Sequence, residues 1–165
     1  MGGGGTGGGG VDGGGGGGGG GNWEHQDIIH KLFDHHTLIT RDSEDTVNGI
    51  EACTYSNDPS TADWIKEHVS QMKGLLESES GSIRRWDSLF KIAFDLRDYH
   101  GIEVEETEKG VCVKQEVITA EGEIADCTKA VIQAHSDVLD KFIQFGKEEA
   151  QSSHEVPQEC AELFV

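Results

Sequence analysis

Residues 65–68 read Ile65-Lys66-Glu67-His68, and the pattern returns further along the chain as Ile132-Gln133-Ala134-His135. Apolar residues recur around both copies at a spacing of three or four, which is typical of one face of an α-helix. Each copy places its histidine on that apolar face, downstream of an expected β-hairpin. The repetition predicts two related units, each of which turns an ionisable side chain towards the core.

Two β-hairpins are predicted around Asn48-Gly49 and Lys109-Gly110. Asn-Gly is a strong signal for a tight hairpin, because both residues tolerate a positive φ angle. We expect strands at residues 38–45, 47–55, 101–108 and 111–119. Helices are expected at residues 23–38, 59–76, 87–99 and 123–145, with Asp58 as the cap of the second and Pro59 at its first position.

The two halves of the chain align with each other. An offset of 61 residues places Ile28-Ile29-Leu32-Phe33 on Leu89-Phe90-Ala93-Phe94, and the offset becomes 67 after the second hairpin. A hairpin of two strands buries too little surface to be stable alone. We therefore predict an α+β fold, in which a duplicated helix–β-hairpin–helix unit forms one four-stranded antiparallel sheet packed against helices.

The glycine distribution divides the chain into segments. Residues 1–21 are almost entirely glycine, so they have no side chains to bury and are predicted to be a disordered polyglycine tract. Residues 22–157 are expected to form a single domain made of two repeats, at about 23–80 and 82–149, followed by a flexible tail at 158–165. The tract shows neither the basic nor the apolar region of a secretory signal, so composition leaves the compartment open.

The chain carries 31 acidic and 13 basic residues, a formal net charge of −18. Such a charge repels phosphate backbones and anionic lipid, so we expect no nucleic-acid partner. No apolar run approaches the roughly 20 residues that span a bilayer, so no membrane span is expected. The charge suits a metal ion or a basic protein partner, although a highly soluble surface explains it equally; the oligomeric state is left open.

The four cysteines, Cys53, Cys112, Cys127 and Cys160, show no CxxC spacing. The pattern is therefore neither that of a zinc finger nor that of covalent haem attachment. Cys53 and Cys112 fall in corresponding hairpins, where they could be neighbours across a sheet. The sequence leaves open whether they are thiols or a disulfide.

Three histidines are predicted to point inwards. His68 and His135 hold equivalent positions on apolar helix faces, and His35 aligns with Leu96 of the other half. A buried imidazole needs partners for its N–H and its lone pair, and one shared ion would satisfy several rings. Met72 lies one turn after His68 on the same face. The predicted metal site is therefore His35, His68, His135 and Met72, holding copper, zinc or haem iron, with separate packing roles as the alternative.

The other histidines are expected to face solvent. They are His25, His30, His36, His100 and His154. They lie near the ends of predicted elements or on their polar faces.

Several spaced motifs carry a resemblance. The stretch His35-His36-x-x-Ile39-Thr40-Arg41, the pattern Ile65-x-x-His68-Val69-x-x-Met72 and the run Ile132-Gln133-Ala134-His135 are similar to a group of small, usually exported bacterial proteins of unknown function. The resemblance implies an exported or periplasmic-like location and supplies no activity. Relatives of this pattern often carry histidine where this chain has Leu96.

We therefore expect a small, acidic, non-catalytic binding protein that holds a transition-metal ion or haem through interior histidines. The same pattern also fits a structural or interaction module, whose histidines only pack the core. A third reading is an enzyme that uses a histidine as acid or base in a pocket between the halves.

Overall fold

The computed structural model describes residues 23–79, 81–161 and 163, so the predicted polyglycine tract lies outside the described residues. The helices are α1 (Trp23–Asp34), α2 (Pro59–Glu77), α3 (Ser88–Asp95), α4 (Gly122–Phe145), α5 (Lys147–Ala150) and α6 (Gln158–Ala161). Two short 3-10 helices are η3 (His36–Leu38) and η4 (Arg97–Tyr99). The strands are β2 (Thr40–Asp45), β3 (Gly49–Tyr55), β4 (His100–Glu106) and β5 (Gly110–Val117).

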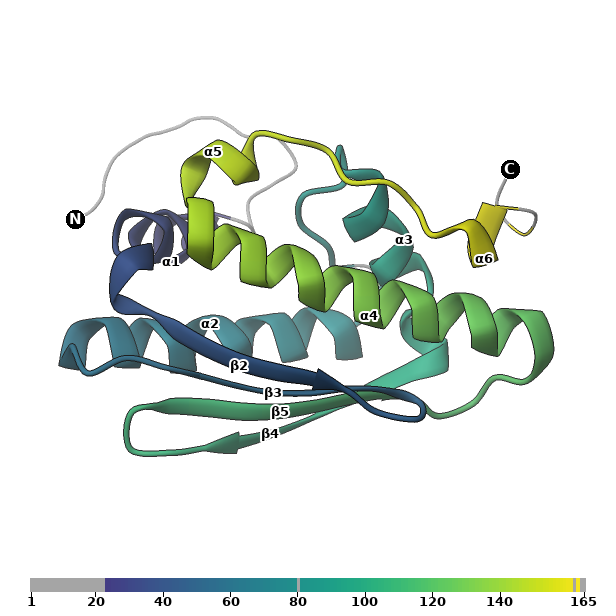
Figure 1. The fold of residues 1–165 in the computed structure, drawn as a ribbon, viewed down its shortest axis with the longest axis horizontal. Helices are drawn as coiled ribbons and strands as arrows, with labels where there is room; N and C mark the ends of the chain where they lie inside the picture. The colour runs from purple at the N-terminus through teal and green to yellow at the C-terminus, as the bar shows by residue number, and fades with distance from the viewer. Residues whose placement is uncertain (1–22, 80, 162, 164–165) are drawn as a thin grey trace.

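The four strands form one antiparallel sheet in the order β2-β3-β5-β4, and helices cover one of its faces (Figure 1). Helix α2 packs on β3, β4 and β5, whereas α4 packs on β2, β3 and β5. Helix α1 packs against α2, and α3 against α4. The predicted α+β class, with a four-stranded antiparallel sheet packed against helices, is confirmed.

The element order helix, 3-10 helix, two strands, helix occurs twice along the chain. This order agrees with the two repeats that the sequence predicts. The origin of the halves by duplication stays a prediction, because a shared order of elements alone does not establish it.

Two glycines at the starts of the central strands are required by close backbone contact. A Cβ at Gly49 would lie 1.9 Å from the carbonyl oxygen of Gln115, and one at Gly110 would lie 1.9 Å from that of Thr54. Neither glycine has a positive φ angle. The hairpin glycines therefore allow the close pairing of β3 with β5. A 2.8 Å hydrogen bond from the amide of Thr46 to the carbonyl of Gly49 closes the first turn, so Val47 and Asn48 lie at its tip, one residue before the Asn-Gly pair that the sequence suggests.

Side-chain caps set where two helices begin. Asp58 accepts hydrogen bonds from the amide of Thr61 at 3.0 Å and from its hydroxyl at 2.7 Å, as predicted for the start of α2. Asp87 caps α3 by accepting from the amide of Leu89 at 3.0 Å. Both caps satisfy amide groups that have no partner within the helix.

All four cysteines are paired in disulfides. Cys53 lies opposite Cys112 in the register of β3 with β5, and the two are bonded, so the expected neighbourhood across the sheet is confirmed. Cys127 of α4 is bonded to the fully buried Cys160. The predicted flexible tail began at residue 158, whereas the structure places Gln158–Ala161 in helix α6, fixed to α4 by this bond.

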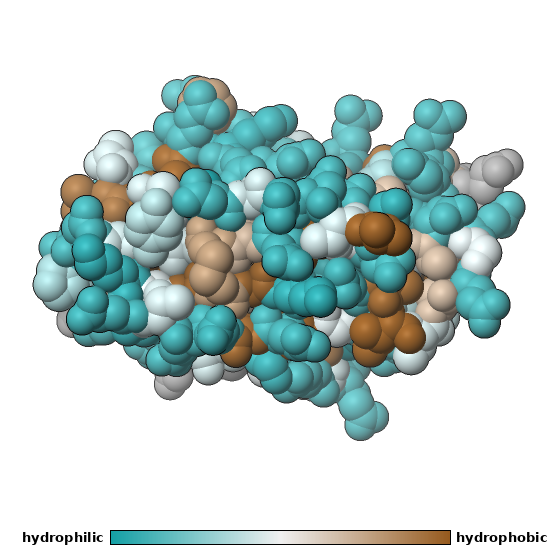
Figure 2. Space-filling model, turned by 60° about the horizontal axis from the view of Figure 1, so that its bottom comes forward, coloured by the Kyte–Doolittle hydropathy of each residue, from teal (hydrophilic) through white to brown (hydrophobic). Residues whose placement is uncertain are grey.

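The largest hydrophobic cluster lies between α3, α4 and the C-terminal segment, and only a small cluster around Ile50, Ala52 and Ile132 lies at the sheet. Figure 2 shows the molecule turned so that its underside comes forward, and this view is mostly hydrophilic. Within the described residues, no helix combines the length and the hydropathy needed to cross a membrane. The uneven core matters for function, because the space between the sheet and the helices is incompletely filled.

Candidate ligand cavity

A cavity of about 660 Å³ lies between the sheet and the helices. Most of its wall is aliphatic or aromatic, with Ile50 and Ala52 from β3, Ile65 from α2, and Leu139 and Phe142 from α4. Small-molecule sites in proteins commonly measure roughly 300–1,000 Å³ and are lined mainly by apolar side chains with a few polar groups. The cavity has the size and the wall chemistry of such a site.

His135 of α4 is the polar group that stands out in this wall. Its ring packs edge-on against Phe90, with ring centroids 4.7 Å apart. Burial lowers the pKa of His135 to about 3, and the nearby charge of Arg41 adds to this effect. The imidazole is therefore neutral at physiological pH, with one N–H donor and one acceptor lone pair.

Arg41 of β2 also lines the cavity, and its side chain is 6% exposed. One terminal nitrogen donates to the carbonyl of Ser136 at 3.0 Å and to Oδ1 of Asp140 at 2.8 Å, and the other donates to Oγ of Ser136 at 2.9 Å. A guanidinium has five N–H groups, so these bonds leave two without a partner among the described residues. We call Arg41, His135 and Ser136 the polar corner of the cavity.

His100 contrasts with His135, because both of its nitrogens are bonded. Nε2 of His100 donates to the carbonyl of Ala93 at 3.1 Å. Its Nδ1 accepts from Nε2 of the Gln115 side chain, also at 3.1 Å. Burial lowers the pKa of His100, so this ring also stays neutral. The expectation that His100 faces solvent is wrong. It begins β4, and the alternation His100, Ile102, Val104 places it on the covered face of the sheet, a signal the sequence contained.

The residues predicted as a metal site are only partly brought together. His68, Met72 and His135 all line the cavity, whereas His35 does not. The Nδ1 of His35 donates to the carbonyl of Lys31 at 2.8 Å, and its ring packs on Trp64 with centroids 4.9 Å apart. In the described part of the chain, no group of three or more His, Cys, Asp or Glu side chains could hold a metal ion. The three imidazoles therefore do not converge.

Two further histidines expected in solvent are held by distant parts of the chain. His36 lines the cavity and donates from Nδ1 to the carbonyl of Ile143 at 2.6 Å. The side chain of His154 is 10% exposed, and its Nδ1 and Nε2 are hydrogen-bonded to the carboxylates of Asp87 and Glu149, both at 2.6 Å. These expectations are wrong because the partners are far away in sequence, so helical periodicity gives no sign of them.

The cavity reaches the surface where its lining residues are exposed. These are Gln26, His30, Trp86, Lys147 and Gln151, which we call the mouth. In Figure 1, the chain after α5 runs back over α4 to α6 and passes this region. The mouth thus lies between α1, the segment before α3 and the start of the C-terminal segment.

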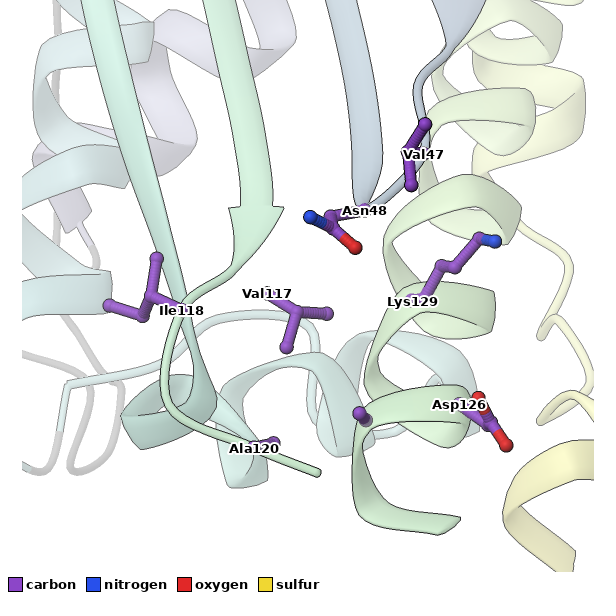
Figure 3. Close-up of a pocket in the computed structure, with 8 residues that line it drawn as sticks. Val47, Asn48, Val117, Ile118, Ala120, Asp126 and Lys129 are labelled. Carbon is purple, nitrogen blue, oxygen red and sulfur yellow. The ribbon is translucent and has the colours of Figure 1, made fainter. Parts of the chain in front are cut away.

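A second hollow, of about 260 Å³, lies at the end of the sheet (Figure 3). Its wall includes Val47 and Ile118, which are 82% and 64% exposed, and the charged residues Asp126 and Lys129 of α4. In Figure 3 the side chains of Val117 and Ile118 point in opposite directions, as expected for successive residues of an extended chain. This shallow surface site has no buried polar group comparable to His135.

Comparison of the chain with models of protein families, with curated proteins and with solved structures found no match in any of the three. The resemblance to small exported bacterial proteins therefore stays a prediction, as does the location that it implies.

Proposed function

We propose that this protein is a small, non-catalytic binding protein that holds an apolar organic ligand in the cavity between its sheet and its helices. The observation that carries this proposal is the mainly apolar space of about 660 Å³, with the neutral imidazole of His135 in its wall. A neutral imidazole has one N–H donor and one acceptor lone pair. A ligand with a polar group at His135 would bond to one of them.

The apolar wall favours an organic ligand over water. The cavity corresponds to the liquid volume of roughly 20 water molecules, and each buried water needs two to four polar partners. Most lining side chains are hydrocarbon, and His36 and His100 already bond to backbone carbonyls. An apolar ligand would instead restore the packing contacts that an unfilled cavity lacks.

The histidines of the wall favour binding over catalysis. A general base works best with a pKa near the operating pH, whereas burial holds the pKa of His135 at about 3. The pKa of His100 is also lowered by burial, and both of its nitrogens are occupied. Neither ring is tuned for proton transfer at neutral pH.

Haem is a second candidate ligand, favoured by the placement of His68, Met72 and His135 in one cavity wall. Neutral imidazole and thioether are both axial ligands of haem iron, and both bind copper. A bare zinc ion fits these side chains less well than haem does, because zinc sites in proteins usually have at least three protein ligands from His, Cys, Asp or Glu. Among the metal ligands proposed from the sequence, haem fits the apolar wall best.

The test is binding of N-phenyl-1-naphthylamine, a neutral dye whose fluorescence rises in apolar surroundings. We expect one dye per protein, and loss of binding in Leu139→Trp, because the larger ring fills the cavity. Leu38→Trp is the matched control, since Leu38 is 47% exposed and outside the cavity wall. Circular dichroism establishes that both variants are folded.

The same samples separate the remaining functions. A haem protein would give a Soret band on adding haemin, and that band would change in His135→Leu. Failure of both dye and haemin to bind folded protein would contradict the proposal and leave the structural module as the account of these histidines.

A further inference from the structure

We infer that the ligand is an apolar carboxylic acid, bound with its carboxylate at the polar corner and its hydrocarbon part along the apolar wall. This inference rests on the proposed function and names the chemical class of the ligand. It is carried by two side chains from different elements, Arg41 of β2 and His135 of α4. Both line the cavity, and the three hydrogen bonds of Arg41 use only part of the five N–H groups of its guanidinium.

The guanidinium of Arg41 lies between the surface and the cavity. Its ionic partner Asp140 is 42% exposed and also accepts from the hydroxyl of Ser43 at 3.1 Å. The negative charge that compensates Arg41 is therefore at the solvent side, shared and screened by water. The side chain itself is 6% exposed and lines the cavity, and two of its five N–H groups have no acceptor among the described residues. A second carboxylate fits that position.

His135 supplies a further donor beside this charge. The influence of Arg41 on His135 is the largest after burial, so the guanidinium is electrostatically close to the ring. Asp87 acts on the ring in the opposite direction. A guanidinium charge beside an N–H donor favours an anionic oxygen acceptor.

A neutral polar group matches the corner less well. A hydroxyl carries no charge, so it would leave the charge of Arg41 without a buried counter-ion. The carboxylate of an apolar acid satisfies both side chains, because its two oxygens accept several hydrogen bonds at once. The wall supplies the complementary apolar part, including Val69 and Met72 of α2 and Leu139 of α4.

The opposite orientation is also testable, because the mouth contains Lys147. This side chain is 59% exposed and already pairs with Asp34 at 2.7 Å. An acid bound with its carboxylate outwards would depend on Lys147, whereas one bound inwards would depend on the polar corner.

The experiment is calorimetric titration of the full chain, freed of lipid by organic extraction and refolding, with decanoic acid and with 1-decanol at pH 7. We expect the acid to bind about tenfold more tightly than the alcohol. Arg41→Met and His135→Leu are each expected to weaken acid binding about tenfold and to leave alcohol binding unchanged. Lys147→Met is the matched control and should change neither affinity.

Each other outcome overturns the inference in a recognisable way. Equal affinity for acid and alcohol would refute the carboxylate assignment, while the proposed apolar cavity would stand. A loss confined to Lys147→Met would reverse the orientation and so contradict the polar corner. If the naphthylamine dye, the acid and the alcohol all fail to bind, the proposed function fails as well. Should Arg41→Met not fold, His135→Leu decides the assignment by itself.

Discussion

The ring of His135 packs edge-on against Phe90, with the two centroids 4.7 Å apart. This contact holds one side of the imidazole in the wall of the cavity. Phe90 itself stacks on Phe142, with centroids 5.9 Å apart and planes inclined by 24°. The part of the wall that carries the imidazole is therefore aromatic.

The first prediction compares His135→Leu with His100→Leu in ligand-free protein. Leucine at position 135 replaces a polar ring by a hydrocarbon side chain in a mainly apolar wall, so we expect unchanged stability or a gain of about 1 kcal/mol. Removing His100 breaks two hydrogen bonds and leaves Gln115 and the carbonyl of Ala93 unpaired, so a loss of about 2–4 kcal/mol is expected. Urea unfolding measures both. Equal losses in the two variants would show that His135 has a structural partner.

The second prediction concerns acid. The pKa of His135 in the folded state is about 3, below the usual histidine pKa of 6.5. The unfolded chain therefore binds more protons between these values, so stability is lost as the pH falls from about 6.5 towards 3. Between pH 7 and pH 4 this residue alone should lower the free energy of unfolding by about 3 kcal/mol.

The comparison with His135→Leu isolates that contribution. The variant has the same carboxylates, so losses from their protonation are common to both proteins and cancel in the difference. Stability differences that stay constant from pH 7 to pH 4 would argue against a buried neutral ring at position 135.

The third prediction concerns the central glycines. Gly49→Ala and Gly110→Ala each force a Cβ into a carbonyl oxygen of the neighbouring strand, so each should lower the free energy of unfolding by more than 2 kcal/mol. Gly74→Ala is the control, because a Cβ there meets nothing within 4 Å and Gly74 lies inside α2. That change should stabilise the protein by about 0.5–1 kcal/mol. Tolerance of alanine at both strand positions would contradict the pairing of β3 with β5.

The fourth prediction concerns the C-terminal segment. The bond from Cys127 to Cys160 spans 33 residues, and the entropy model gives about 3–4 kcal/mol for a loop of that length. The double variant Cys127→Ala/Cys160→Ala should lose a similar amount in guanidinium unfolding. Protease cleavage between α5 and α6 should also become faster. Thiol titration of the unfolded, unreduced wild-type chain should find no free cysteine, and two free thiols would refute this pairing.

Much of the fold follows from local patterns in the sequence. Asp58 and Pro59 mark the start of α2 by capping chemistry, and apolar spacing predicts the four long helices. The four strands are predicted from the turn residues Asn48-Gly49 and Lys109-Gly110, which mark the two hairpins. Their assembly into one sheet is expected because neither hairpin is stable alone. Element ends are less well predicted: α1 ends at Asp34 and α3 at Asp95, each followed by a 3-10 turn, where longer helices are expected.

The candidate site is predicted only in part, because it depends on distances between layers. His68, Met72 and His135 are placed inwards by helical spacing, and the structure puts all three in the cavity wall. His35 does not line the cavity. Its ring lies just past the end of α1 and bonds to the carbonyl of Lys31 in that helix. The cavity itself has no local signature, since its volume depends on how far the helices stand from the sheet.

The most direct test of the central claim is nuclear magnetic resonance of the ¹⁵N-labelled imidazole of His135. In free protein the ring should show the chemical shifts of a neutral tautomer from pH 5 to pH 8. Adding decanoic acid should shift these signals in proportion to occupancy, while the signals of His35, bonded to its own helix, stay in place. If His135 titrates near pH 6.5, or its signals do not move when the acid is bound, the account of this cavity is contradicted.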